Sequence, residues 1–294
     1  MPQRLATRGS TLALAQAQTV AELLGGAELI PASSDGEPGD KSRFVRGVER
    51  ALLEGRAAIG VHSAKDLPAQ MPAGLVIAGA PAREAPQDAF VGEAGAIEDV
   101  PEGAKVGTSS LRRRSQLLAL RPDLEISELH GNVDTRLRRL EEGVLDGIVL
   151  AAAGLRRLGR EDAVAFAFAP AQMTPAAGQG VLALQARTED PEAIEAAKEI
   201  SDARAMAELA AERAVVAALD ATCNTPVGVH AICDRGRIAI DGFAGLPDGS
   251  EAIRESIDGD DADPAALGDE LGRRMIDAGA TEILRRAEEQ AAGS

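Results

Sequence analysis

Residues 105–117, KVGTSSLRRRSQL, show the pattern that decides the fold. A short β-type run ends in a glycine turn, three hydroxyl residues follow, and a helical segment begins with three arginines. The free N–H groups and the dipole at such a helix N-terminus favour an anion. Because similar strand-to-helix units lie on both sides of it in the first 200 residues, the sequence predicts parallel sheets covered by helices.

The flanking segments carry matching patterns. Helices are expected over 11–24, where Ser10 can cap the first turn, and over 43–53. Strands are expected over 27–33, 57–62, 74–81, 88–92, 124–129 and 146–154. Beyond Asp190 the sequence predicts two helices, then strands over 227–234, 236–245 and 252–257, and helices from 263 to 290.

These patterns predict an α/β chain with two domains, a cleft between them, and a small α+β C-terminal domain. The expected first domain is discontinuous, because GVLALQAR (180–187) is expected to return the chain to the first sheet. The boundaries are then 1–82 with 180–199 for the first domain, 83–179 for the second and 200–294 for the third. Two crossovers between the first two domains would form a hinge.

The charge of the 294 residues is strongly acidic and unevenly distributed. The chain carries 31 Lys plus Arg against 47 Asp plus Glu, a formal net charge of −16 that would repel nucleic acid and anionic membranes. Residues 105–160 nevertheless carry +4, with ten arginines, while the remainder carries −20. Arginine matches carboxylate or phosphate oxygens in pairs, so the window indicates a small anionic ligand; a solvated helix face is the alternative.

Metal, export and membrane signals are weak. Cys223 and Cys233 lack CxxC spacing and the three histidines are scattered, so no metal site is expected. The N-terminal residues show no signal-peptide pattern, which predicts a cytoplasmic protein. The uncharged stretch 163–186 is broken by prolines and glycines, which predicts a buried or interdomain segment rather than a membrane helix.

The segment GVHSAKDLP (60–68) places polar side chains directly after a strand, where open α/β sheets bind ligands. Asp66 is the candidate acid or base, and Lys65 could hold its carboxylate ionised or contact an anionic substrate. An Asp before Leu-Pro is also typical of a simple turn.

Three successive strand-to-helix turns carry arginines. Arg112 and Arg113 follow the first turn, Arg136 follows Gly131-Asn132, and Arg157 follows the third strand. This predicts convergence of basic groups on several carboxylates or phosphates. Successive helical residues point about 100° apart, so at least one of Arg112, Arg113 and Arg114 is expected to face solvent.

Cys223 is expected in a turn between a helix and a strand, and Cys233 inside an apolar strand. A lone cysteine is often a small buried apolar residue, and this alternative is open for both Cys223 and Cys233. The loop position makes Cys223 the better nucleophile or attachment point.

Taken in order, these motifs resemble the porphobilinogen deaminase (hydroxymethylbilane synthase) family over nearly the whole chain. The resemblance rests on ATRGSTLALAQA (6–17), VHSAKDLP (61–68), REAPQDAF (83–90), GTSSLRRRSQL (107–117), HGNVDTRLRRL (130–140), LAAAGLRRLG (150–159), PAAGQGVLALQAR (175–187), ERA (212–214) and ATCNTPVG (221–228).

The resemblance implies a fold and an activity. Its first two domains look like those of periplasmic solute-binding proteins. The family polymerises four porphobilinogen molecules head to tail, loses ammonia at each addition and releases hydroxymethylbilane. Growth starts on a dipyrromethane cofactor joined by a thioether to the cysteine that matches Cys223, and the catalytic aspartate matches Asp66. A cytoplasmic monomer with porphobilinogen as its small-molecule partner, and with no nucleic acid or membrane partner, is expected.

The resemblance also implies ligands for the acetate and propionate groups of the pyrroles. Cofactor contacts are expected from Lys65, Ser109, Ser110, Arg112, Arg113, Gly131 and Arg136. Substrate contacts are expected from Arg8, Ser10, Gln16, Arg136, Arg157 and Gln179. A lid over the cleft is expected to include Lys41, Arg43 and Phe44.

Two departures from the family pattern stand out. His130 replaces the usual Arg before Gly-Asn, which predicts a weaker carboxylate clamp because histidine is shorter and only partly charged at neutral pH. The lid loop over 33–44 is shortened, with Ser42-Arg43 where Gly-Leu is usual, and Arg43 is hypothesised to compensate for lost basic groups.

Two other classes of function compete with this one. A carboxylate-binding module without catalysis would share the architecture and the arginine turns, but the pair of Asp66 and Cys223 argues against it. Nucleic-acid binding through the arginine helices is disfavoured by the net charge and by the presence of only five aromatic residues, all Phe.

Overall fold

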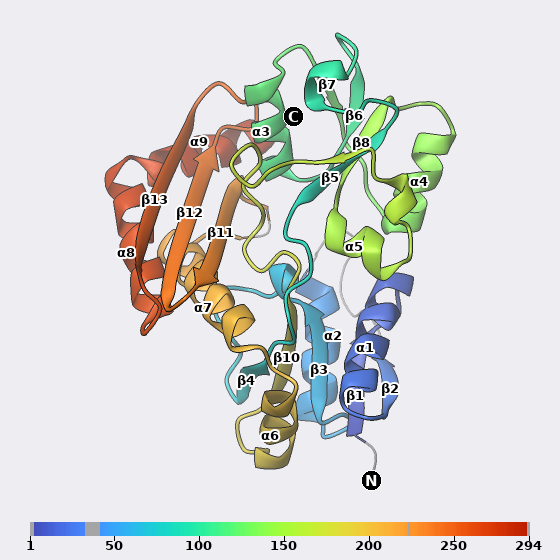
Figure 1. The fold of residues 1–294 in the computed structure, drawn as a ribbon, viewed down its shortest axis with the longest axis vertical. Helices are drawn as coiled ribbons and strands as arrows, with labels where there is room; N and C mark the ends of the chain where they lie inside the picture. The colour runs from blue at the N-terminus through green and yellow to red at the C-terminus, as the bar shows by residue number, and fades with distance from the viewer. Residues whose placement is uncertain (1–2, 33–41, 223, 293–294) are drawn as a thin grey trace.

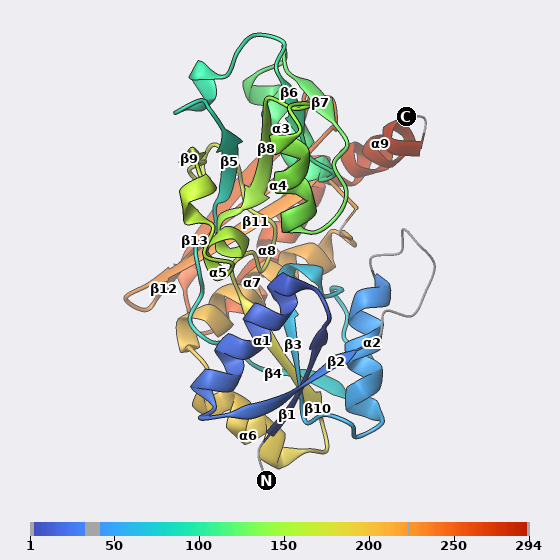
Figure 2. The same ribbon diagram turned by 90° about the vertical axis from the view of Figure 1, so that its right-hand side faces the viewer.

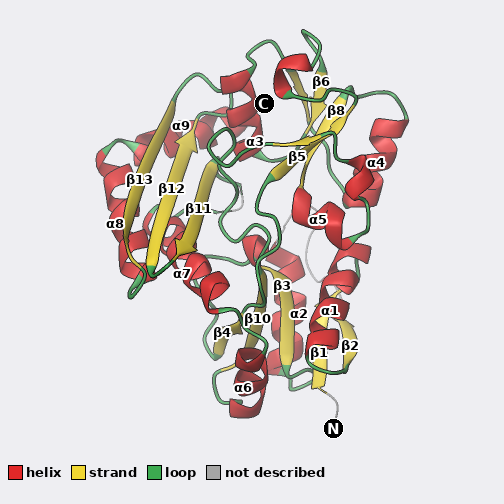
Figure 3. Ribbon diagram, viewed as in Figure 1, coloured by secondary structure: helices red, strands yellow, loops and turns green. Residues whose placement is uncertain are grey.

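The computed structural model describes residues 3–32, 42–222 and 224–292. Two five-stranded sheets and one three-stranded sheet, each with helices packed on it, form three units that Figures 1 and 3 show side by side. The α/β fold class expected from the sequence, with a small C-terminal sheet domain, is confirmed. The domain boundaries stay a prediction.

The first sheet has the strand order β2-β1-β3-β10-β4. Its strands are β1 (Gln3–Arg8), β2 (Ala27–Ala32), β3 (Ile59–Ser63), β4 (Leu75–Gly79) and β10 (Leu182–Arg187). Helices α1 (Thr11–Leu23) and α6 (Pro191–Glu199) cover one face and α2 (Ser42–Leu53) the other (Figure 2). Neighbouring residues of a strand point to opposite faces, so Leu5 packs with α1 and Ala6 packs with α2.

The second sheet has the order β7-β6-β8-β5-β9. Its strands are β5 (Asp88–Gly92), β6 (Lys105–Gly107), β7 (Glu125–Ser127), β8 (Gly147–Ala151) and β9 (Phe166–Ala167). Helix α3 (Leu111–Leu120) covers the face that carries Phe90 and Val149. Helices α4 (Val133–Glu141) and α5 (Ala152–Arg157) cover the face that carries Val91 and Ile148.

The two sheets repeat one arrangement. In each, three parallel strands are followed by one antiparallel strand, β10 in the first sheet and β5 in the second. Both antiparallel strands come directly after a chain crossing, over residues 80–87 and 168–181. The crossings touch, because the amide of Glu84 donates to the carbonyl of Gly180 at 3.1 Å. This hydrogen bond holds the two crossings together.

The third unit is an antiparallel sheet with helices on one face. It contains α7 (Ala203–Ala218), β11 (Val227–Asp234), β12 (Arg237–Gly245), β13 (Ala252–Asp260), α8 (Pro264–Asp277) and α9 (Ala280–Ala292). Val215, Ile240 and Leu271 belong to the core between the helices and the sheet. The unit is fastened to the second crossing, because the amide of Val229 donates to the carbonyl of Pro175 at 2.8 Å.

Short 3₁₀ turns complete the described chain: η1 (Ala64–Asp66), η2 (Ile97–Asp99) and η3 (Glu161–Ala163). The stretch 163–186 holds β9, the second crossing and β10, much of it buried, as expected of an interdomain segment. Within the described ranges we find no helix long and apolar enough to cross a membrane.

Some strand boundaries differ from the predicted ones. The strand expected over 57–62 begins at Ile59, because the amide of Ala57 still bonds to Ala51 at the end of α2. The strand expected over 252–257 continues to Asp260, because β12 is long enough to pair with it up to Arg237. The strand expected over 124–129 shrinks to Glu125–Ser127 at the sheet edge, where it pairs with β6 alone.

Candidate active site

Arg8 and Asp66 meet at one edge of the first sheet. Arg8 is the last residue of β1, and Asp66 ends η1 directly after the neighbouring parallel strand β3. The Nη1 atom of Arg8 lies 3.3 Å from Oδ2 of Asp66. The Asp66 side chain is 43% exposed, so its carboxylate is open to a ligand. The predicted position of this segment at a strand's carboxyl end is confirmed.

Two further predicted ligands on α1 support the local structure. The Oγ atom of Ser10 accepts a hydrogen bond from the amide of Ala13 at 3.3 Å and so caps the helix. Gln16 is buried, and its Nε2 atom donates to Oγ of Ser63 at 2.8 Å. This bond holds α1 against the end of β3, next to the turn that carries Asp66.

Lys65 extends from the same turn toward the second crossing. Its Nζ atom donates to Oε1 of Gln179 at 3.2 Å. Burial, helped by the nearby Arg113, lowers the pKa of Lys65 to about 8 although Asp66 and Asp88 oppose the shift. The surroundings of Lys65 therefore favour deprotonation of its ammonium group.

Arg112 and Arg113 converge on a buried carboxylate. Asp88, the first residue of β5, accepts from Nη1 of Arg112 at 2.7 Å and from Nε of Arg113 at 2.8 Å. Burial opposes ionisation of Asp88, but the two arginines outweigh it and hold the pKa of this carboxyl well below its ordinary value. Arg114, the third arginine, is half-buried, and no hydrogen bond between it and Asp88 or the two neighbouring arginines is found.

The turn before α4 brings Arg136 toward the same edge of the second sheet. Its Nε atom donates to the carbonyl of Gly131 at 3.0 Å, and its Nη2 atom donates to Oγ of Ser109 at 3.4 Å. Burial and the nearby Arg113 lower the pKa of Arg136 to about 10. Ser110 caps α3 through the amide of Arg113. Two of the three basic turns therefore converge.

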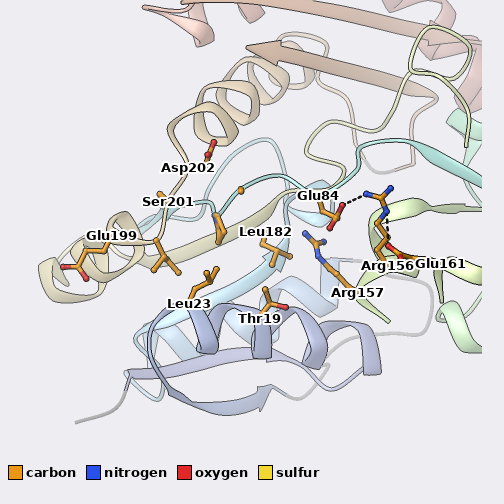
Figure 4. A pocket seen from close by; sticks show the side chains of 13 residues that line it. Thr19, Leu23, Glu84, Arg156, Arg157, Glu161, Leu182, Glu199, Ser201 and Asp202 are labelled. Carbon is orange, nitrogen blue, oxygen red and sulfur yellow. Dashed lines mark hydrogen bonds and ion pairs between the residues drawn. The ribbon is translucent and has the colours of Figure 1, made fainter. Parts of the chain in front are cut away.

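Arg157 lies farther along its helix. It ends the six-residue helix α5, roughly 9 Å of helix beyond the strand. Its Nη2 atom donates to the carbonyl of Gly180 at 2.7 Å. The side chain lines a cavity of about 570 Å³ beside the two crossings (Figure 4), with Thr19 and Leu23 of α1 on its wall. Burial lowers the pKa of Arg157 to about 10, and Glu84 opposes the shift.

Three of these cations share one property. Lys65, Arg136 and Arg157 are half-buried, and within the part of the chain that the structure describes none forms an ion pair with a carboxylate. Burial of an unpaired cation costs free energy, which a ligand carboxylate can offset. The arrangement therefore suits a ligand with several carboxylates.

The comparison with known proteins decides the family. Residues 3–195 match the family model "Porphobilinogen deaminase, dipyromethane cofactor binding domain", and residues 206–277 match "Porphobilinogen deaminase, C-terminal domain". The chain belongs to the porphobilinogen deaminase family. The resemblance expected from the motifs is confirmed. The first match covers both five-stranded sheets, and the second covers α8 and most of the third unit.

Porphobilinogen deaminases from several bacteria are similar over nearly their whole length. The protein from Campylobacter curvus is 41% identical over 306 residues, covering 98% of each chain. That from Desulforudis audaxviator is 42% identical and covers 95% of this chain and 96% of its own. That from Deinococcus radiodurans is 41% identical and covers 96% and 98%.

Among solved structures, a substrate-binding domain of a putative amino acid ABC transporter from Streptococcus pneumoniae is 14% identical. It covers 68% of this chain and 91% of its own, with a TM-score of 0.43. A TRAP solute-binding protein from Ochrobactrum anthropi is also 14% identical, covers 68% and 75%, and has the same TM-score.

Some residues singled out by the family resemblance fall outside the description. Cys223 and Lys41 lie outside the described residues. Arg43 and Phe44 belong to the first turn of α2, and only their backbone is described. Their roles in a porphobilinogen deaminase stay predictions, as does the compensation hypothesised for Arg43.

His130, which departs from the family pattern, lies on the exposed side of the turn before α4. Its Nε2 atom is 2.8 Å from Oε2 of Glu128, and both side chains are about three-quarters exposed. Any contact of His130 with a ligand carboxylate would compete with this partner. The weaker clamp expected from the sequence stays a prediction.

The buried acids Asp88, Glu208 and Glu212 were not predicted from the sequence. Asp88 was visible only as one carboxylate at the start of an apolar strand. Glu208 and Glu212 on α7 both lie within 3.3 Å of Arg83. Their spacing of four residues among buried alanines was the available signal. Across the described ranges no group of three or more His, Cys, Asp or Glu could hold a metal ion.

Proposed function

We propose that this protein joins four porphobilinogen molecules head to tail, with loss of ammonia at each addition, and releases hydroxymethylbilane. Beyond the family assignment, one observation carries the proposal: Lys65, Arg136 and Arg157 are half-buried cations without a carboxylate partner among the described residues. Each pyrrole unit has an acetate and a propionate, so a growing chain supplies the missing carboxylates.

The residues present suit a covalently held dipyrromethane primer. Lys65 belongs to the turn after β3 of the first sheet and Arg136 to α4 beside the second sheet, and the turn hydroxyls of Ser109 and Ser110 lie beside Arg136 and Arg113. The cysteine proposed to carry the primer, Cys223, follows α7 in the connection to β11. When bound, the primer supplies the free pyrrole α-carbon to which the first substrate is joined.

Asp66 is the proposed catalytic residue. Loss of ammonia from the aminomethyl group of porphobilinogen leaves an electron-poor azafulvene, and carbon–carbon bond formation places positive charge on pyrrole nitrogens. An exposed carboxylate beside those nitrogens stabilises that charge. The same carboxylate can give a proton to the leaving amine and accept the proton lost from the new bond. Arg8 at 3.3 Å orients Asp66 from the adjacent strand.

The intact mass of the purified protein tests the cofactor assignment. We expect an excess equal to two linked pyrrole units, which is lost in Cys223→Ser. Cys233→Ser is the matched control, because this second thiol is buried in β11 and burial raises its pKa to about 11. The control should keep both the mass excess and hydroxymethylbilane formation. Active enzyme with an unmodified Cys223 would refute the assignment.

Product analysis separates catalysis from binding alone. A carboxylate-binding module would bind porphobilinogen without releasing ammonia or hydroxymethylbilane.

We further propose a cytoplasmic monomer without a nucleic-acid or membrane partner, a proposal supported by the family assignment and by the net charge of −16. Size-exclusion chromatography with light scattering checks the monomer against its mass of 30.3 kDa.

A further inference from the structure

Gln179 lies in the second crossing, between the two five-stranded sheets. Its exposure is 0%, so both ends of its side-chain amide must find partners inside the protein. Oε1 accepts from Nζ of Lys65 at 3.2 Å. Nε2 donates to the carbonyl of Pro86 at 2.7 Å and to Oδ1 of Asp88 at 3.0 Å.

The chemistry of these partners fixes the orientation of the amide. A lysine ammonium can only donate, whereas the Pro86 carbonyl and the Asp88 carboxylate can only accept. Gln179 therefore has its oxygen toward Lys65 and both amide hydrogens toward the second unit. No side-chain N–H remains for a substrate carboxylate, so the geometry does not suit Gln179 as a direct substrate ligand.

The backbone around Gln179 is held as firmly as its side chain. Its carbonyl accepts from Nε of Arg83 at 3.0 Å, and Arg83 in turn lies 2.7 Å from Glu212 on α7. The preceding amide, of Gly178, donates to the same Glu212. Arg83, Gln179 and Glu212 thus join both crossings to the third unit.

The amide of Gln179 is the point where two functional groups of opposite sheets meet. On one side is Lys65, next to Asp66 in η1. On the other side is Asp88, which holds Arg112 and Arg113. Arg113 and Asp88 also act electrostatically on Lys65, which places all three groups in one neighbourhood.

We propose that Gln179 is a positioning residue that ties the amine of Lys65 to the Asp88 anchor and so sets the distance between the η1 turn and the second sheet. The predicted effect on kcat rests on the proposed function. The placement of Lys65 can be tested separately, by a measurement that does not depend on enzyme activity. Misplacement of a positioned group by about 1 Å can cost on the order of a hundredfold in rate.

Competitive labelling of Lys65 provides the test. The purified full-length protein is trace-labelled with acetic anhydride at a series of pH values, and peptide mass spectrometry reports the pH midpoint for the reaction of Lys65. Gln179→Met has a similar size, but its thioether sulfur is only a weak acceptor for the ammonium. Loss of that bond disfavours the charged amine, so we expect the midpoint to fall by about one pH unit.

Gln179→Asn and Gln172→Met complete the series. The asparagine keeps an amide but withdraws it by one methylene, so it should lower the midpoint in the same direction, and it supplies the measurement where Gln179→Met does not fold. Gln172 lies in the same crossing but is exposed, and among the described residues its side chain accepts a hydrogen bond only from the amide of Ala169. Gln172→Met should leave the midpoint and the rate unchanged.

The kinetic constants separate positioning from direct binding. At about pH 6, where the Lys65 amine stays charged in every variant, a positioning role predicts that kcat falls about tenfold to a hundredfold in the Gln179 variants with little change in KM. An unchanged Lys65 midpoint in both variants overturns the inference, and so does a raised KM with kcat preserved. Wild-type protein that lacks the two-pyrrole mass and makes no product would refute the proposed function instead, because the labelling shift is measured independently.

Discussion

Arg113 and Asp88 form a buried ion pair in which the Nε and Nη2 atoms of Arg113 lie 2.8 and 2.7 Å from Oδ1 of Asp88. The Asp88 carboxylate is completely buried, and its other oxygen accepts from Arg112 at 2.7 Å. One carboxylate therefore compensates two buried guanidinium groups. Removing its charge leaves both without an anion.

We expect Asp88→Asn to lower the free energy of unfolding by about 3–5 kcal/mol, because breaking a buried pair leaves an uncompensated buried charge. Urea denaturation measures the loss. Asp123→Asn is the control, since Asp123 pairs with Arg121 at the surface and should change little. Equal losses in the two variants would contradict this account of Asp88.

The pH dependence of stability should report the same carboxyl. Because Asp88 has a depressed pKa in the folded state, its stabilisation is present above the unfolded carboxyl pKa of about 4 and is lost as pH falls toward the folded value. We expect unfolding free energy to decline between about pH 5 and pH 2, and to decline less steeply in Asp88→Asn. If unfolding free energy falls equally steeply with pH in the wild-type protein and in Asp88→Asn, Asp88 does not cause the pH dependence.

Asp66→Ala should keep the fold and lose hydroxymethylbilane formation. The pair with Arg8 is exposed, so its loss should change the free energy of unfolding by at most about 1 kcal/mol. Thermal unfolding and product absorbance measure the two effects. Glu54→Ala, at a similarly exposed carboxylate directly after the C-terminal end of α2, should retain activity. A near-normal rate in Asp66→Ala would exclude Asp66 from the mechanism.

Lys65 should make substrate binding sensitive to alkaline pH. Its pKa of about 8 means that the amine loses its charge as pH rises through that value, and a neutral amine attracts a carboxylate less strongly. We expect the KM for porphobilinogen to rise above about pH 8. Lys65→Arg stays charged and should move this rise to higher pH; an identical profile would show that Lys65 does not set it.

Gly180→Ala should disrupt the contact between the two crossings. The residue has φ +89°, and an added Cβ would lie 2.1 Å from the carbonyl oxygen of Glu84. We expect a loss of about 3 kcal/mol or more in unfolding free energy, from strain and from backbone displacement. Gly159→Ala, at φ +64° with open space around it, should cost only about 1 kcal/mol. Chemical denaturation measures the unfolding free energy of both variants. Similar losses in the two would show that the close approach of Gly180 to Glu84 does not contribute to stability.

Much of the local structure was predictable because its causes are local. Ser10 caps α1, as its position before a periodic helix indicated, and α3 begins after the glycine turn and its hydroxyl residues, as expected. The position of Asp66 at a strand's carboxyl end followed from the apolar run before it. Strand boundaries were harder to predict, since β13 is extended by pairing with β12 and not by its own pattern.

The carboxylate partners of the basic residues could not be predicted from the sequence. The sequence predicted that Arg112, Arg113, Arg136 and Arg157 gather at one sheet edge, because neighbouring parallel strands end there. Arg157 lies instead beside the two crossings, where it donates to the carbonyl of Gly180. It did not predict that Asp88 occupies Arg112 and Arg113, because β5 enters the sheet antiparallel after a chain crossing.

The amino-acid sequence by itself determined the alternation of strands and helices, the capped helix starts, the catalytic candidate Asp66 and the family. Only the tertiary structure decided that Gln179 joins Lys65 to Asp88 and that Arg83 pairs with Glu212. Periodicity and capping act within a few residues along the chain, so they are visible in sequence. These pairs span about 90 to 130 residues, and the order of strands in the two sheets brings them together.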